Sequence, residues 1–295
     1  MPDNVFPLDS TQPFTAQEIT GHNRWHPDIP AAVHVKPGES FRLDCREWFD
    51  GAIKNDDSAD DIRDAPMDIV HALSGPVAIE GAKPGDLLIV DILDVGPIPQ
   101  EDGPLAGQGW GYTGIFAKKN GGSFLVDQFP DAYKAVWDFS GGTATSRHVP
   151  GVSFTGIVHP GLMGTAPSKD LLGKWNTREA ALIATEPNRE PPLALPPEPQ
   201  GAILGSLSGE DFNQVASEGA RTAPHGRTAA TRTSRTSPRA HESSIRCSST
   251  ARTSPSAIST SARATVRSPS AAASKWAVSS TSASTSSRVG WTPMG

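Results

Sequence analysis

The sequence predicts a mainly β (α+β) fold with a β-sandwich-like core and minor helices. The stretch from residue 68 to residue 97 supports this fold most directly. Two runs rich in aliphatic and β-branched residues, 77–79 and 87–93, flank a Pro-Gly turn signal at 84–85. The second run is almost continuously apolar, as is typical of a strand buried on both faces. Apolar and polar residues alternate over positions 41–45, which indicates a half-buried strand.

Composition narrows the class of protein. The 295 residues carry a formal net charge of −6, which argues against a general nucleic-acid-binding protein. No run approaches the roughly eighteen apolar residues of a membrane span, and the polar N-terminus lacks the features of a secretory signal. Cys45 and Cys247 are too few for a disulfide framework. We therefore expect a cytoplasmic protein with no nucleic-acid or membrane partner.

The composition changes sharply near residue 220. Residues 221–295 contain no Leu, Phe, Tyr or Asp and are dominated by Ser, Thr, Ala and Arg. Such a segment buries too little apolar surface to offset its ordering entropy. The sequence therefore predicts a β domain over 1–220, followed by a low-complexity, disordered tail over 221–295. A natural basic tail that binds nucleic acid or an anionic surface is the alternative, which the lack of interleaved aromatic residues disfavours.

Two residues at predicted strand ends are candidates for acid–base chemistry. Glu47 lies at the end of the strand that starts at Phe41, between Arg46 and Trp48, where burial would raise the pKa of its carboxyl toward that of a useful base. His159 ends an apolar run directly before a loop, a common position for a ligand or an acid–base residue. The acidic stretch at 55–64 is more simply a solvated loop than a cation site.

A glycine-rich stretch over 103–122 contains Trp110 and Tyr112 at alternate positions. Glycines allow close backbone approach, and the two interleaved aromatic side chains are candidates for the walls of a small substrate pocket. The spacing matches neither a dinucleotide-binding fingerprint nor a phosphate loop, so nucleotide binding is not expected.

Five segments follow one another along the chain in a characteristic order. They are 70–76 (Val-His-Ala-Leu-Ser-Gly-Pro), 80–86 (Glu-Gly-Ala-Lys-Pro-Gly-Asp), 109–116 (Gly-Trp-Gly-Tyr-Thr-Gly-Ile-Phe), 147–151 (Arg-His-Val-Pro-Gly) and 159–168 (His-Pro-Gly-Leu-Met-Gly-Thr-Ala-Pro-Ser). Together they resemble the acetamidase/formamidase family, in particular its formamidase branch, over about residues 21–224. The resemblance implies a mostly β, sandwich-like fold. It also implies hydrolysis of formamide or another short aliphatic amide to a carboxylate and ammonia, and homo-oligomers, often trimers, among intact relatives.

The tail departs from this family in a specific way. The family motif Gly-Asp-Leu-His-Phe-Ser-Gln-Gly-Asp-Gly-Glu is absent, yet codons that encode residues 257–268 can be chosen so that a one-base shift reads this motif. Residues 226–237 likewise regroup, in the same displaced frame, to Gly-Gly-Asn-Ala-Asp-Ile-Lys-Asn-Leu, a second family motif. We therefore hypothesise a single-base frameshift near 224–227, which leaves the β domain incomplete and impairs activity.

The resemblance also assigns candidate roles. Amide hydrolysis needs an activated water or nucleophile, stabilisation of the oxyanion and an acid for the leaving ammonia. Within residues 1–220 we choose Glu47 as base or ligand, and His71 and His159 as ligands or proton donors. Alternatively, His71 is a buried histidine that fixes the following turn.

The cofactor is open from sequence alone. The lost motifs would supply further acid–base groups or ligands, for example around a divalent metal ion such as zinc. The alternative function is a non-catalytic β-sandwich binding protein with a disordered basic tail.

Overall fold

The structure is a computed structural model. It describes residues 2–84, 86–99, 106–116, 130–140, 142–155, 158–185 and 198–222, together with four later strands whose backbone alone is described. These later strands are β13 (Ala229–Thr231), β14 (His241–Arg246), β15 (Ala257–Ala264) and β16 (Ala272–Thr281).

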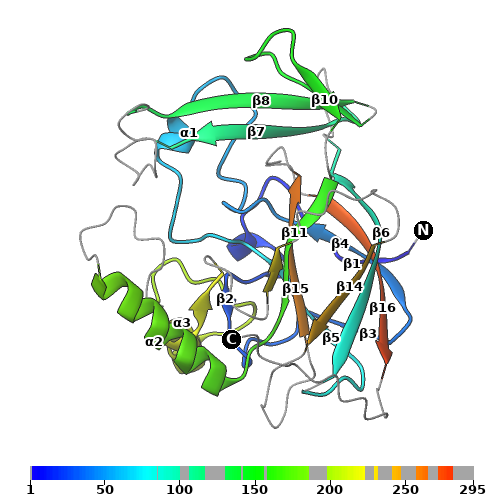
Figure 1. Ribbon diagram of the computed structural model, residues 1–295, viewed down its shortest axis with the longest axis vertical. Helices are drawn as coiled ribbons and strands as arrows, with labels where there is room; N and C mark the ends of the chain where they lie inside the picture. Colours follow the sequence, from blue (N-terminus) through cyan, green and yellow to red (C-terminus); the bar gives the residue numbers. More distant parts are fainter. Residues whose placement is uncertain are drawn as a thin grey trace, which may run out of the picture.

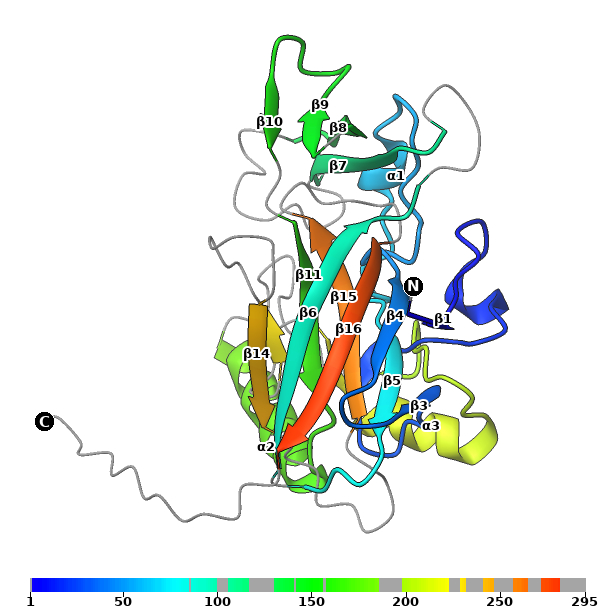
Figure 2. The ribbon, with the colours of Figure 1, turned by 90° about the vertical axis from the view of Figure 1, so that its right-hand side faces the viewer.

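Two five-stranded sheets form the body of the molecule (Figures 1 and 2). The first has the order β1-β4-β16-β6-β14 and the second the order β13-β11-β15-β5-β3. Besides the four later strands, the two sheets contain β1 (Asn4–Phe6), β3 (Val33–Val35), β4 (Ser40–Cys45), β5 (Ser74–Ile79), β6 (Leu87–Pro97) and β11 (Val158–Thr165). The prediction of a mainly β, sandwich-like fold is confirmed.

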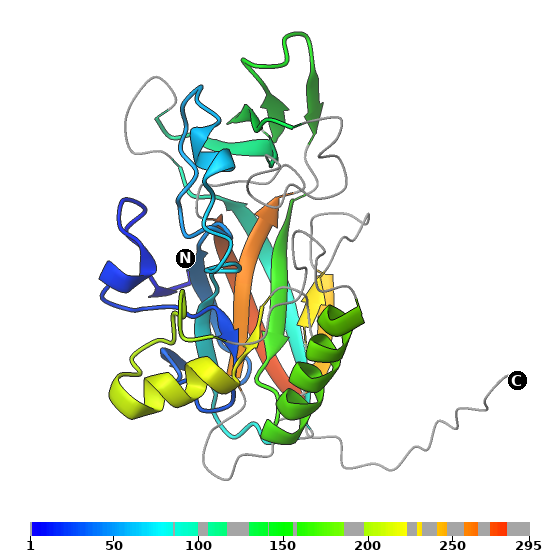
Figure 3. The ribbon, with the colours of Figure 1, turned by 90° about the vertical axis from the view of Figure 1, so that its left-hand side faces the viewer.

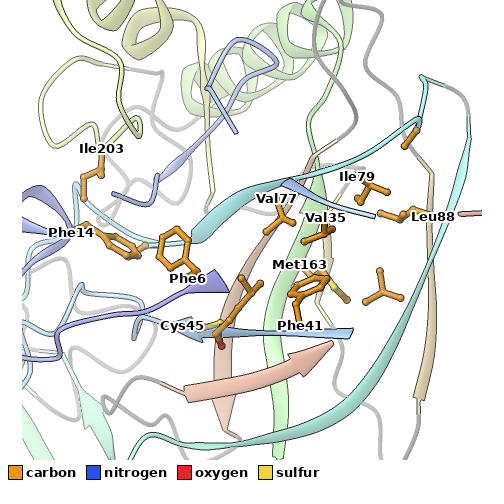
Figure 4. Close-up of a cluster of buried hydrophobic side chains, with 14 residues drawn as sticks. Phe6, Phe14, Val35, Phe41, Cys45, Val77, Ile79, Leu88, Met163 and Ile203 are labelled. Carbon is orange, nitrogen blue, oxygen red and sulfur yellow. Dashed lines mark hydrogen bonds between the residues drawn. The ribbon is translucent and has the colours of Figure 1, made fainter. Parts of the chain in front are cut away.

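The main hydrophobic core lies between these sheets. Phe41 and Leu43 of β4 and Leu88 of β6 pack in one cluster with Val77 of β5 and Met163 of β11 (Figure 4). The alternation over positions 41–45 therefore places one face of β4 in the core, as the period of two requires.

β6 differs from the strand predicted at 87–93. It continues to Pro97 because β16 pairs with it along its whole length. Its Leu93 side chain is 46 % exposed, so the second half of the apolar run is not buried on both faces as expected.

A smaller sheet lies at one end of the sandwich (Figure 1). Its order is β10 (Ser153–Thr155), β9 (Thr143–Thr145), β8 (Tyr133–Ser140) and β7 (Gly109–Ile115). The short helix α1 (Asp60–Arg63) approaches β7 closely because Gly114 has no Cβ; a Cβ there would lie 2.9 Å from Ile62 Cδ1. This approach brings α1 and the segment after β4 under the small sheet.

Helices α2 (Lys169–Thr185) and α3 (Gly209–Glu218) lie on one side of the sandwich (Figure 3). Leu172 and Trp175 of α2 pack against Trp25 of β2 (Arg24–Trp25). That strand pairs with β12 (Ala220–Arg221). A 3₁₀ turn, η1 (Phe14–Ala16), completes the described elements up to residue 222. No helix in the described ranges is long and apolar enough to cross a membrane.

The predicted tail, 221–295, begins with ordered residues. Arg221 and Thr222 are buried, so the ordered part extends at least two residues beyond the boundary drawn from composition. The backbone of β14, β15 and β16 pairs with β6, β11, β5 and β4. Strand pairing joins main-chain groups whatever the side chains, which is why the Ser-, Thr- and Ala-rich composition did not indicate these strands. The rest of the tail lies outside the described residues.

Candidate active site

Glu47 lies just past the end of β4, in a tight turn. The Asp50 N–H donates to the Glu47 backbone oxygen (2.9 Å), and Asp50 and Gly51 have φ values of 56° and 76°. This left-handed backbone, which glycine adopts without strain, brings the Gly51 N–H back to the Glu47 carboxylate (3.0 Å). The turn thus supplies backbone donors to the carboxylate, from Gly51 and from Phe49.

A side-chain donor comes from the small sheet. The Tyr112 hydroxyl of β7 donates to Glu47 Oε1 at 2.7 Å, and both side chains are almost fully buried, at 1 % and 2 % exposure. Burial raises the pKa of Glu47 to about 7, although the hydrogen bonds from Tyr112 and from backbone N–H groups oppose the shift. A carboxyl that is half ionised near neutral pH is suited to take and return a proton.

Trp48 joins this pair to His71. Its Nε1 donates to the Tyr112 hydroxyl oxygen (2.8 Å), and its ring stacks on the His71 imidazole with centroids 5.4 Å apart. We call these four residues, Glu47, Trp48, His71 and Tyr112, the Glu47 cluster. The structure therefore brings together two of the three predicted catalytic residues.

His71 is held through its backbone. Its N–H donates to Thr222 Oγ1 at 2.6 Å, and the Thr222 hydroxyl donates in turn to the His71 backbone oxygen at 3.0 Å. Thr222 follows β12, so a residue 151 positions away in the sequence fixes the backbone beside the cluster. Nothing in the local sequence around either residue indicates this contact.

The acidic stretch that follows Glu47 binds basic side chains of the small sheet. Lys134 Nζ, whose side chain is fully buried, contacts Asp56 (2.7 Å) and Asp61 (2.8 Å). Arg147 and His148 contact Asp57. This loop therefore anchors the small sheet above the Glu47 cluster. Asp56 and Asp57 are largely exposed, as a solvated loop requires, whereas Asp61 is mostly buried.

Comparison with known proteins identifies the relatives of this chain. A family model described as the acetamidase/formamidase family matches residues 7–233. The chain belongs to this family. The match begins earlier than the resemblance at about residue 21 and ends close to the proposed frameshift.

Individual proteins with the names of this family are also similar to the chain. An acetamidase from Mycolicibacterium smegmatis is 62 % identical over 224 residues, covering 76 % of this chain and 55 % of the relative. A formamidase from Methylophilus methylotrophus is 56 % identical over 203 residues, covering 69 % and 48 %. The chain thus spans about half the length of the curated relatives it matches. A gamma lactamase from Delftia acidovorans shares the structure with a TM-score of 0.82 at 39 % identity, over 95 % of this chain and 68 % of that one.

The structure places the remaining predicted site residues in three different settings. Tyr112 was expected as a pocket wall, but its hydroxyl is a direct hydrogen-bond partner of Glu47. Trp110 is partly buried and packs against the hydrophobic cluster that contains Tyr112. His159 lies in β11, opposite Arg263 of β15, and its side chain is outside the described part of the chain. The catalytic roles of Glu47, His71 and His159 stay predictions.

The Glu47 cluster does not by itself fit the metal ion that the resemblance implies. Among the described residues, no three His, Cys, Asp or Glu side chains lie close enough to hold an ion. Both Glu47 carboxylate oxygens already accept a hydrogen bond from the protein. We therefore derive no chemical step through a metal.

Proposed function

We propose that this chain is an amide hydrolase that converts formamide or another short aliphatic amide to a carboxylate and ammonia. Its relatives are named for acetamide, formamide and a lactam, all of which contain an amide carbon–nitrogen bond. The observation that carries the proposal is the buried Glu47 carboxyl, held by Tyr112 and Gly51 with a pKa of about 7. This is the acid–base group that the reaction requires.

In the proposed reaction, ionised Glu47 takes a proton from a water molecule as the water oxygen bonds to the amide carbon. The same proton then passes from Glu47 to the amide nitrogen, the carbon–nitrogen bond breaks, and ammonia leaves. The acid product ionises to the carboxylate, and Glu47 returns to its charged form. His71, whose ring stacks on Trp48, is our candidate for a ligand or a proton donor. Trp110 is proposed as a pocket wall and His159 as a second proton donor.

We further propose that a frameshift near 224–227 impairs this chain. The family match ends at residue 233, and relatives at up to 62 % identity match over at most 224 residues. On this account, the displaced frame encodes further ligands or acid–base groups, and a divalent metal such as zinc would be held there. We also propose that the protein is cytoplasmic and that it forms a homo-oligomer. For intact relatives we expect a trimer.

Ammonia release tests the function. The assay compares this chain with a frame-restored chain, in which one base is corrected near codons 224–227, on formamide and acetamide. We expect the restored chain to release ammonia from at least one amide, and this chain to release much less. If the restored chain releases none, the hydrolase proposal fails, and the alternative of a non-catalytic β-sandwich binding protein replaces it.

A further inference from the structure

We propose that Tyr112 is a positioning residue for Glu47: its hydroxyl hydrogen, oriented by the Trp48 indole, fixes Oε1 as a hydrogen-bond acceptor. This inference rests on the proposed role of Glu47 as the base. It assigns to Tyr112 a function different from that of a pocket wall.

The direction of the hydrogen bonds follows from the chemistry of the groups. The indole Nε1 of Trp48 can only donate, so in its 2.8 Å contact the Tyr112 oxygen is the acceptor. The single hydroxyl hydrogen of Tyr112 is therefore directed to Glu47 Oε1, 2.7 Å away. The relay runs one way, from Trp48 through Tyr112 to Glu47.

The neighbouring cation acts on Glu47 only through its charge, which is the smallest of the effects that lower the pKa of Glu47. Arg46 precedes Glu47, but its Nε donates to Asp50 Oδ1 at 2.7 Å and its Nη2 to the Asp50 backbone oxygen at 3.1 Å. Its guanidinium is thus directed to Asp50. Among the described side chains, Tyr112 is the one that donates a hydrogen bond to Glu47.

The hydroxyl is also held in place. Tyr112 is 1 % exposed, lies opposite Val136 of β8, and packs in a cluster with Phe49 and Ile62. Its ring cannot swing into solvent without opening the contact between the small sheet and the loop beneath it. A donor fixed in this way stabilises the charged carboxylate more strongly than its protonated form.

The test is a titration of the Glu47 carboxyl by infrared difference spectroscopy on the chain as it exists. Glu47→Gln removes the Glu47 band and so identifies it. In Tyr112→Phe we expect the midpoint to rise by about one pH unit, a tenfold gain in proton affinity, because a hydrogen bond to the charged form is lost. Tyr133→Phe makes the same chemical change at a half-exposed tyrosine and should leave the midpoint unchanged. An unchanged midpoint in Tyr112→Phe overturns the proposal.

A second variant covers the case in which Tyr112→Phe does not fold. Trp48→Phe removes the donor to the Tyr112 oxygen and should raise the same midpoint by a smaller amount, because the relay loses its polarisation. An unchanged midpoint here, with Tyr112→Phe unfolded, also overturns the proposal.

The titration separates this inference from the proposed function because it needs no turnover. A shift without ammonia release from any form of the chain rejects the hydrolase and keeps the Tyr112 assignment. Where ammonia is released, the pH profile of kcat/KM should move with the carboxyl midpoint.

Discussion

Two opposing effects act on the Glu47 carboxyl. Burial disfavours the charged form, while the Tyr112 hydroxyl and the Gly51 N–H favour it. Burial is the larger effect and leaves the pKa near 7, above the ordinary value of 4.5. The carboxyl can therefore exchange a proton near neutral pH, but the folded protein is less stable when Glu47 is ionised than when it is protonated.

This difference predicts a pH dependence of stability. Because the folded-state pKa is raised, the folded protein binds the proton more tightly than the unfolded chain between pH 4.5 and 7, and stability falls as the pH rises through that window. Relative to Glu47→Gln, the free energy of unfolding should fall by about 3 kcal/mol between pH 4.5 and pH 8. Urea denaturation of both proteins across this range measures the difference. Parallel curves would contradict the raised pKa.

The Thr222 hydroxyl provides a second prediction at the scale of single residues. Thr222→Val removes both hydrogen bonds to the His71 backbone and leaves buried groups without this partner, so we expect a loss of about 1–3 kcal/mol in the free energy of unfolding. Thr222→Ser keeps the hydroxyl and should lose about 1 kcal/mol or less. Chemical denaturation of the two variants decides. Equal losses would show that packing of the Thr222 methyl group, and not its hydroxyl, holds this segment.

The sequence offers Glu47, His71 and Tyr112 as separate candidates but does not indicate the contacts that join them. A carboxylate at the end of an alternating strand, between an arginine and a tryptophan, is visible locally. The hydrogen bond to Tyr112 joins residues 65 positions apart and depends on how the small sheet docks on the loop after β4. No local pattern specifies that docking, so the sequence offers Tyr112 only as a candidate pocket wall and gives no sign of its hydrogen bond to Glu47.

At the scale of elements, the contact between the acidic loop and β8 holds the small sheet in place. Lys134 is fully buried and has two carboxylate partners, of which the Asp61 side chain is 15 % exposed and the Asp56 side chain 54 %. Removing one partner of a buried ion pair costs more than removing one partner of an exposed pair, because it leaves a buried charge uncompensated. The two partners should therefore contribute unequally.

We predict that Asp61→Asn lowers the free energy of unfolding by about 2 kcal/mol, whereas Asp56→Asn lowers it by less than about 1 kcal/mol. Denaturation at low and high salt measures both, and the Asp56 effect should weaken more with salt. Equal losses in the two variants would show that the buried Asp61–Lys134 pair is not the contact that holds the small sheet on the loop.

The strands near the core show what sequence patterns can predict at this scale. The alternation over 41–45 indicates most of β4, and the apolar run 77–79 indicates the second half of β5, because these side chains face one core. The extension of β6 to Pro97 was missed because it depends on pairing with β16, a distant strand with no apolar pattern of its own.

For the whole molecule, the family match ends at residue 233, close to the change in composition near residue 220. The match, over residues 7–233, contains the strands of both body sheets from β3 to β13 and the buried Thr222. The strands beyond it pair with the same sheets through their backbone. A frame-restored chain would place different side chains in these positions, and we expect it to be the more stable and the more active of the two.

The central claim is that Glu47 is the base of an amide-cleaving centre, and the pH dependence of ammonia release from formamide tests it most directly. For the frame-restored chain, the account predicts that kcat/KM rises with pH through an apparent pKa of about 7, the value for Glu47, and that Glu47→Gln abolishes ammonia release. Full activity in Glu47→Gln, with an unchanged pH profile, would contradict the account.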